Sequence, residues 1–264
     1  MLEIKNISKT FNPGTINEKK ALVDVSLRLE DGDFVTVIGG NGAGKSTLLN
    51  AVAGVWPVDS GSISVNGIDL THLPEHKRAR YIGRVFQDPM MGTAADMWIE
   101  ENLALSLRRG KRRTLRPGIT KSERAMFMEK LTMLGLGLEY RLTSKVGLLS
   151  GGQRQALTLL MASLQKPYLL LLDEHTAALD PKTAAKVLEA TDRIVARDRL
   201  TTIMITHNMK DAIAHGNRLI MLHEGRIILD IKGEEKKKLT VEDLLRQFER
   251  VSGEQFSSDK ALLG

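Results

Sequence analysis

Cysteine is absent from the 264 residues of the chain. Without it the chain can form neither a disulfide scaffold nor a cysteine-ligated zinc site, and a reducing compartment is the simplest expectation. Long apolar runs are also missing, because the longest, such as LLLL at 169–172, are far too short to cross a bilayer. Charged residues interrupt the apolar amino terminus, so no signal peptide is expected. These absences predict a soluble protein, and 42% hydrophobic residues can fill a core.

Positive charge is present in excess, and the formal net charge of +6 comes from one segment. Residues 108–124 hold eight lysines or arginines and one acid, Glu123. Such a segment is a solvated surface, a contact with anionic lipid or a contact with a phosphate backbone. It contains no aromatic residue, which argues against a platform that stacks single-stranded bases.

The order of the predicted elements indicates an α/β fold. Apolar alternation and unbroken aliphatic runs predict strands or hairpins, at 1–40, 61–70, 168–174, 201–207 and 218–231. Helical spacing and cap residues predict helices, at 46–54, 88–145, 150–165 and 181–195. Within the first part, Val23, Val25, Leu27 and Leu29 alternate with polar residues, which is typical of a strand.

The sequence GGNGAGKS at 39–46 matches the phosphate-binding pattern G-x-x-x-x-G-K-S/T between a predicted strand and a predicted helix. Glycines allow backbone N–H groups to turn inward around phosphates, and the helix amino terminus adds a positive dipole. Lys45 is expected to contact the β- and γ-phosphates, and the Ser46 hydroxyl to bind Mg²⁺. The nucleotide contacts predicted here are Gly39, Asn41, Gly42, Gly44, Lys45, Ser46 and Thr47.

Two adjacent acids end the aliphatic run LLLLDE. Asp173, at the end of a strand expected beside the phosphate loop, is placed to hold Mg²⁺ directly or through water. Glu174 cannot usefully bind the same face of the metal, so it is expected to polarise an attacking water. A salt-bridged surface acid is the alternative for Glu174.

A second glycine pair begins another predicted helix, in LLSGGQ at 148–153. Ser150 is expected at the helix N-cap, with its hydroxyl and the N–H groups of Gly151 and Gly152 facing outward. This arrangement predicts a second anion-binding surface. The residues alone leave open whether the two surfaces meet within one chain or between two chains.

Six motifs occur in a fixed order, GGNGAGKST, FQDP, LSGGQ, LLLLDE, AALD and MITHN. Together they resemble the ATP-binding subunit of ABC transporters over residues 1–231. The resemblance implies a P-loop NTPase fold, in which helices flank a mixed core sheet. It also implies an antiparallel β subdomain at the amino terminus and a helical subdomain inserted at about 88–155. Residues 232–264 are expected to form an amphipathic helix, capped by Thr240, and a polar tail.

The resemblance also implies ATP hydrolysis by a head-to-tail dimer of two copies, or of this chain and a paralogous subunit. The LSGGQ of each subunit would close over ATP held by the other. The residues that would then contact the nucleotide across the interface are Ser150, Gly151, Gly152 and Gln153. Asp180 would lie at this interface, and its place before Pro181 independently predicts a helix N-cap.

Further roles follow from the same resemblance. Gln87 would sense the γ-phosphate and Mg²⁺, and His207 would contact the γ-phosphate and orient Glu174. Outside that context, a lone histidine is usually a packed side chain. The predicted cofactors are ATP and Mg²⁺, and the predicted catalytic residues are Lys45, Gln87, Glu174 and His207.

Two further positions near the expected site are Phe11 and His175. Phe11 stands where the family usually has an aromatic residue that stacks on adenine, and core packing is the alternative. His175 is a departure, because the family usually has a proline after the catalytic glutamate. A mainly structural role is expected for His175.

The resemblance predicts a motor subunit that drives a separate transmembrane permease. The sequences of residues 54–70 and 171–181 are similar to the corresponding segments of ATP-binding subunits that work with amino-acid-type binding proteins. An importer of a small solute such as an amino acid is therefore expected, with an extracytoplasmic solute-binding protein as an indirect partner. The chain would lie peripherally on the cytoplasmic face of the membrane, with 108–124 near the membrane or permease, and no nucleic acid is expected.

The apolar residues after Gln87 suit either a docking groove for a permease helix or core packing; they are Met90, Met91, Met97 and Trp98. Two alternative functions remain open, a soluble ABC ATPase in macromolecular assembly and the motor of a lipoprotein or antibiotic exporter. A phosphate-loop GTPase is excluded because no N-K-x-D guanine-reading motif is present.

Overall fold

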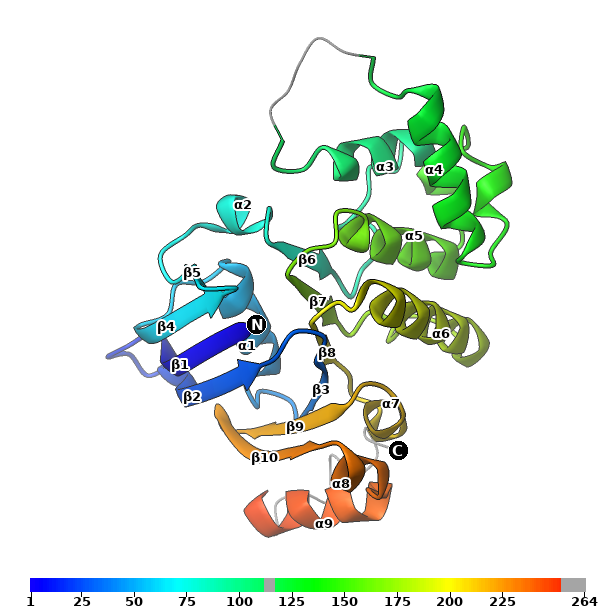
Figure 1. Cartoon of the computed structure of the whole chain (residues 1–264). Helices are drawn as coiled ribbons and strands as arrows, with labels where there is room; N and C mark the ends of the chain where they lie inside the picture. Colours follow the sequence, from blue (N-terminus) through cyan, green and yellow to red (C-terminus); the bar gives the residue numbers. More distant parts are fainter. Residues whose placement is uncertain (112–116, 253–264) are drawn as a thin grey trace.

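Two β-sheets form the centre of the molecule, and a computed structural model describes residues 1–111 and 117–252 (Figure 1). The smaller sheet is antiparallel, with the order β2-β1-β4-β5. The larger has the order β10-β9-β3-β8-β7-β6, and all its strands are parallel except β10 at one edge. The strands are β1 (Leu2–Phe11), β2 (Lys19–Leu29), β3 (Phe34–Ile38), β4 (Ser60–Val65), β5 (Ile68–Asp69), β6 (Ile82–Val85), β7 (Leu169–Asp173), β8 (Thr202–Ile205), β9 (Arg218–His223) and β10 (Arg226–Lys232). This arrangement confirms the predicted fold class.

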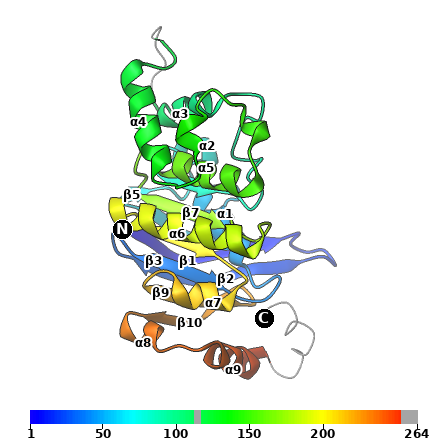
Figure 2. The ribbon, with the colours of Figure 1, turned by 90° about the vertical axis from the view of Figure 1, so that its right-hand side faces the viewer.

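The helices divide between the two ends and the middle of the molecule. Helices α3, α4 and α5 gather at one end, whereas α8 and α9 lie beside β10 at the other (Figures 1 and 2). The helices are α1 (Lys45–Ala53), α2 (Glu75–Arg78), α3 (Ile99–Leu107), α4 (Lys121–Thr132), α5 (Gly151–Ser163), α6 (Pro181–Asp198), α7 (Met209–Ala214), α8 (Glu234–Lys237) and α9 (Val241–Ser252). The predicted division at 88–155 and at residue 231 stays a prediction. Within the described ranges, no helix is long and apolar enough to cross a membrane.

The aliphatic runs are strands covered on both faces. Successive residues of β7 point to opposite sides of the sheet. Leu170 and Leu172 therefore join a core shared with α3, α4, α5 and α6, while Leu169 and Leu171 join one shared with α1 and the smaller sheet. All four leucines are completely buried. This two-sided burial is why the run shows no polar alternation.

The parallel register brings separate parts of the sequence to one edge of the larger sheet. Val37 of β3 pairs with Ile205 of β8, and Ile205 pairs in turn with Asp173 of β7. The residues that follow these strands must emerge side by side, because parallel strands end at the same edge. The phosphate loop follows β3, Glu174 follows β7 and His207 follows β8 closely.

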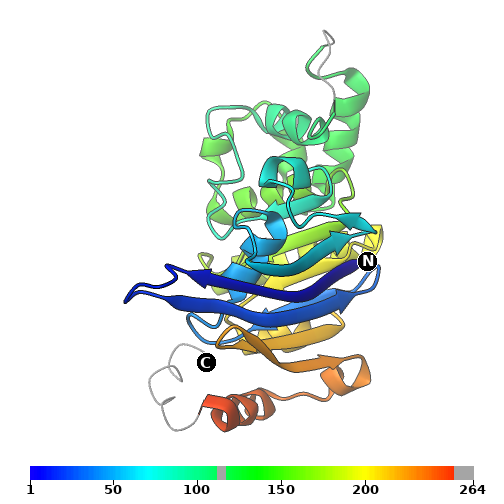
Figure 3. The same cartoon turned by 90° about the vertical axis from the view of Figure 1, so that its left-hand side faces the viewer.

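The predicted strand is present as β2, and the alternation of buried and exposed residues along it is broken at one position. Leu22 and Val25 are buried, whereas Val23 is only half-buried. Between them Asp24 has a φ of +55°, and the pairing with β1 shifts register between Ile7↔Val25 and Lys9↔Leu22. This β-bulge inserts one residue and reverses the face of every side chain before it. The hairpin of β1 and β2 reaches beyond its neighbouring strands (Figure 3).

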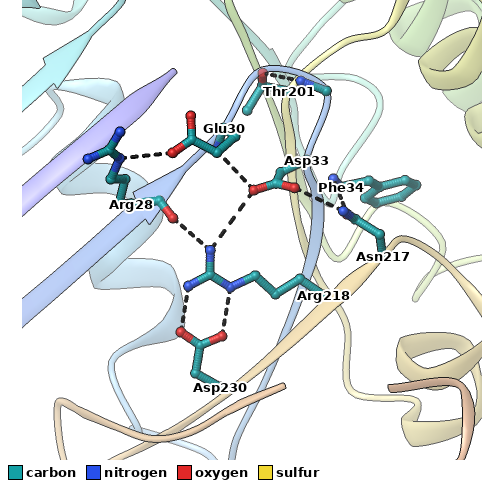
Figure 4. A network of polar contacts seen from close by, with 9 residues as sticks. Arg28, Glu30, Asp33, Phe34, Thr201, Asn217, Arg218 and Asp230 are labelled. Carbon is teal, nitrogen blue, oxygen red and sulfur yellow. Dashed lines mark hydrogen bonds and ion pairs between the residues drawn. The ribbon is translucent and has the colours of Figure 1, made fainter. Parts of the chain in front are cut away.

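A polar network fixes the turn that leads into β3 (Figure 4). Asp33 in this turn accepts a hydrogen bond from Asn217 Nδ2 at 2.9 Å. Arg218 at the start of β9 donates to Asp230 of β10 through Nε at 2.6 Å and Nη2 at 2.5 Å, and to the Arg28 carbonyl at 2.6 Å. The start of the strand that carries the phosphate loop is thus tied to β9 and β10.

The carboxyl-terminal helix predicted from the sequence is present as α9. Its first turn is capped, because Asp243 N–H donates to Thr240 Oγ1 at 3.2 Å and Thr240 N–H donates to Asp243 Oδ2 at 3.0 Å. Leu244 and Phe248 pack with Met209 and Ala212 of α7. The predicted tail at 253–264 and the central part of the basic segment, 112–116, lie outside the described residues.

Candidate nucleotide-binding site

The phosphate loop connects β3 to α1 and packs tightly against the smaller sheet. Gly44 has a φ of +104°, and a Cβ at this position would lie 2.5 Å from the Ala21 carbonyl oxygen of β2. Any other residue would therefore combine backbone strain with a collision. The loop is held in a conformation from which α1 starts directly, so its N–H groups and the helix dipole are available to an anion.

Lys45 lies at the centre of this loop. Its buried Nζ donates to the carbonyl oxygens of Gly39 at 2.7 Å and Gly40 at 3.1 Å. Burial holds the pKa of Lys45 below its usual range, and the nearby carboxylates of Glu174 and Asp173 act in the opposite direction. The loop thus holds one desolvated ammonium close to two acids, where a phosphate would replace carbonyls as its partner.

Glu174 has an unusual backbone and a close partner. Its φ of +46° lies in the left-handed region, which costs a residue with a Cβ of order 1–3 kcal/mol. The side chain is 10% exposed, and its Oε1 lies 2.5 Å from His207 Nε2. His207 comes from the end of β8, so the register of the core sheet produces this pair. The predicted contact between the two residues is present.

A pocket of about 320 Å³ joins these groups to the smaller sheet. Its lining includes Glu174, His207 and most of the loop residues predicted from the sequence, among them Asn41, Gly42, Gly44, Lys45, Ser46 and Thr47. Phe11 at the end of β1 lines it as well, so Phe11 is a pocket residue and its ring packs edge-on against Trp56 at 4.8 Å. Lys19, which opens β2, completes the wall beside Gly42.

Asp173 lies behind this pocket with an arginine as partner. Its Oδ2 is 3.3 Å from Arg84 Nη2, and its side chain is 16% exposed. Burial raises the pKa of Asp173 above its usual range, and Arg84 opposes that rise. Burial disfavours the charged form of a carboxyl group, and a nearby cation stabilises that form.

The oxygen donors present suit Mg²⁺. The ion prefers one or two protein oxygens completed by water and phosphate oxygens. Ser46 offers an exposed hydroxyl and Asp173 a carboxylate. Among the described residues, no group of three or more histidine or acidic side chains is arranged to hold a metal. Ser46 and Asp173 are two of the three residues predicted to contact Mg²⁺, the third being Gln87, and all three assignments stay predictions.

Comparison with known proteins identifies the group to which this chain belongs. The model of the ABC transporter family matches residues 22–177. The chain belongs to the ABC transporter family. It is 48% identical over 250 residues to the tyrosine transport ATP-binding protein of Clostridioides difficile, covering 94% of this chain and 99% of that protein. It is 35% identical over 233 residues to the methionine import ATP-binding protein MetN of Bartonella henselae, covering 86% of this chain and 64% of that protein.

A solved structure resembles this ABC ATPase over most of its length. The dimeric post-hydrolysis structure of the ATP-binding cassette MJ0796, bound to ADP and Pi, has a TM-score of 0.74 and 30% sequence identity. The alignment covers 88% of this chain and 98% of that one. The chain is therefore an ATP-binding subunit of an ABC transporter, and the predicted ATPase activity is confirmed.

The LSGGQ segment of this ABC ATPase forms a capping box. Gln153 N–H donates to Ser150 Oγ at 3.3 Å, and Ser150 N–H donates to Gln153 Oε1 at 3.2 Å. Ser150 and Gly151 are exposed as expected, but Gly152 is buried. A Cβ on Gly152 would lie 2.0 Å from Thr183 Cγ2, so any larger residue there would displace the Thr183 side chain where α5 approaches α6. The predicted outward direction of the Gly152 N–H group stays a prediction.

Gln87 and Asp180 lie apart from the pocket. Gln87 is exposed in a bend beyond β6 and is not part of the lining described above. Asp180 is exposed and caps α6, with its Oδ1 accepting from Thr183 N–H at 3.1 Å. The predicted helix cap is therefore present. The proposed contacts of Gln87 with Mg²⁺ and of Asp180 with a second subunit stay predictions.

Sequence reasoning missed several residues of the site. Lys19 and Trp56 come from segments that contain no recognised motif. The contact of Arg84 with Asp173 could not be predicted, because the sequence of a strand does not indicate which residue its side chains will contact. The signal for Lys19 was its place opposite Phe11 across the β1–β2 hairpin, where the two residues are paired. Thr183 was missed because helix packing does not follow from the periodicity of one helix.

Proposed function

We propose that this ABC ATPase pairs head to tail with a second copy, or with a paralogous subunit, and drives a separate membrane permease that imports an amino acid. The observation that carries the proposal is the 48% identity to a tyrosine transport ATP-binding protein over nearly the whole length of both chains. An extracytoplasmic solute-binding protein would deliver the cargo. The subunit would lie on the cytoplasmic face of the membrane without entering it.

The chemistry of the pocket supports the assigned roles. Glu174 accepts a hydrogen bond from the attacking water and raises its nucleophilicity, and His207 at 2.5 Å fixes the orientation of that carboxylate. Lys45 leaves its two carbonyl partners for the β- and γ-phosphates. Mg²⁺, when held by Ser46 and Asp173, supplies stabilisation of phosphate charge. Phe11 offers a ring to the adenine.

A two-chain active site is supported by the separation of the two anion surfaces. Residues 148–153 belong to the described part of the chain, and none of them lines the phosphate pocket. Ser150 is exposed at the amino terminus of α5, a helix of 13 residues whose dipole favours an anion. A second copy could therefore bring its Ser150 to the γ-phosphate over the open side of the pocket.

A groove beyond Gln87 supports docking of a permease helix. A cavity of about 280 Å³ lies between α2, β6, the end of α3 and α5, and Met91 forms part of its wall. Met90, Met91 and Trp98 are exposed, so core packing does not account for these side chains. Met91 in the wall of this cavity is an adaptable apolar side chain that suits the apolar face of a helix.

Two arginines in the described part of the basic segment are ion-paired. Arg108 pairs with Glu123 at 2.9 Å, and Arg124 pairs with Glu100 at 2.7 Å. Arg109 is half-buried beside the same cavity. Within the described parts of the segment, 108–111 and 117–124, these partners reduce the cationic surface that a membrane, a permease or a nucleic acid would meet.

Uptake measurements test the proposed function. A strain that lacks the gene should lose uptake of labelled tyrosine or another amino acid, and the wild-type gene should restore it. Lys45→Ala should fail to restore uptake, whereas Lys20→Ala removes an exposed lysine outside the pocket lining and should restore it. Unchanged uptake across all amino acids would contradict the proposal. Intracellular accumulation of an exported peptide antibiotic or lipoprotein would favour the exporter alternative.

A further inference from the structure

His175 follows Glu174 directly and is not part of the nucleotide pocket lining. Its side chain is buried, with only 2% of the residue exposed. The ring Nε2 lies 3.1 Å from Thr191 Oγ1, in the middle of α6. The residue next to Glu174 is thus attached to a long helix outside the core sheet.

The hydrogen bonds around Thr191 determine the direction of this contact. Thr191 Oγ1 donates its single proton to the Val187 carbonyl oxygen at 2.8 Å. The hydroxyl therefore accepts from His175, whose ring must carry its proton on Nε2. Both residues are buried, so loss of the Thr191 hydroxyl leaves the His175 N–H without its acceptor, whereas Thr191 keeps its bond to Val187 if His175 is lost.

The backbone of Glu174 needs such an attachment. Its N–H donates to the Ile205 carbonyl at 3.1 Å, and its own carbonyl accepts from Ala177 N–H at 3.0 Å. These bonds tie the peptide to β8 and to the next turn, but a φ of +46° persists only where the surroundings over-determine it. The bond from His175 to Thr191 supplies an anchor immediately after the strained residue.

We infer that His175 is a positioning residue, which holds Glu174 in its left-handed conformation through Thr191 and so keeps the carboxylate against His207. The inference rests on the proposed role of Glu174 as the group that activates water. Without the hydrogen bond from His175 to Thr191, the backbone of Glu174 would relax from its positive φ to a negative one. Such a rotation would move the carboxylate away from its partner.

Steady-state ATPase kinetics of the full chain test this role. His175→Ala and Thr191→Val should each lower kcat by roughly 10–100-fold, the loss expected for a catalytic group displaced by about 1 Å. The KM for ATP should stay within about twofold, since neither side chain lines the phosphate pocket. The double variant should lose no more than the worse single variant, because both substitutions break one bond.

Rescue and control variants separate positioning from general stability. His175→Gln places an amide N–H near the former Nε2 and should retain most of kcat, whereas Thr191→Ser keeps the acceptor and should do the same. Ser163→Ala removes a buried hydroxyl that binds its own helix at 3.0 Å, near the opposite end of α5 from Ser150. It should leave kcat at the wild-type level.

Three outcomes would overturn the inference: a wild-type kcat for Thr191→Val, losses that add in the double variant, or a KM that rises in step with the fall in kcat. A parallel Glu174→Gln measurement distinguishes a failure of the proposed role of Glu174 from a failure of the positioning role of His175. If Glu174→Gln retains turnover, the proposed role of Glu174 fails. If it abolishes turnover while the other variants remain fully active, only the positioning role of His175 fails.

Discussion

Protonation of His175 makes the stability of this ABC ATPase depend on pH in a predictable direction. Complete burial lowers the pKa of His175 from 6.5 to about 4, and His215 lowers it further by a smaller amount. The unfolded chain therefore binds a proton at a higher pH than the folded chain does. Because the unfolded state gains protons first, stability is lost as the pH falls from about 6.5 toward 4.

The size of the loss follows from these two pKa values. Between pH 7 and pH 5, the histidine removes about 2 kcal/mol from the free energy of unfolding. His175→Gln has no group that titrates there and lacks this loss. Urea unfolding of both proteins at the two pH values measures the difference, and all other titrating groups cancel in the comparison. The reasoning would be refuted if, between pH 7 and pH 5, the free energies of unfolding of the two proteins changed by the same amount within about 0.5 kcal/mol.

Three further substitutions test the pocket and the helix packing. Lys45→Ala should lose nucleotide affinity and turnover together, measured by titration and kcat, because its charge acts on phosphate before and during the reaction; unchanged turnover would remove the assignment. Ser150→Ala should cost ~2–4 kcal/mol of transition-state stabilisation in kcat/KM, and a loss under ~1 kcal/mol would mean that the hydroxyl is only a helix cap. Gly152→Ala should lower the free energy of unfolding by about 1–3 kcal/mol through its collision with Thr183. Adding Thr183→Ser, which deletes the colliding Cγ2, should recover most of it, and no recovery would contradict the packing argument.

The sequence predicts the part of the site that depends on strand order. Glu174 and His207 end two aliphatic runs, and neighbouring parallel strands must deliver them to the same edge of the sheet. The position of Lys45 could also be predicted, because a glycine-rich turn between a strand and a helix constrains the backbone locally. These predictions need little knowledge of long-range packing.

Features that depend on packing between segments far apart in the sequence could not be predicted. The close contact between Gly152 and Thr183 could not be predicted, because nothing near Gly152 in the sequence indicates that α6 approaches it. The bulge at Asp24 moved Val23 off the buried face, and a single inserted residue leaves no trace in an alternating pattern. His175 was expected to be structural, and its partner Thr191 lies 16 residues away on a helix.

Light scattering of the Glu174→Gln protein tests the composite site most directly, because blocked hydrolysis should retain bound ATP. Mg-ATP should double the measured molar mass relative to the nucleotide-free protein, and adding Lys45→Ala to the same chain should prevent the change. A protein that keeps the mass of one chain at saturating Mg-ATP would contradict a nucleotide site completed by a second copy.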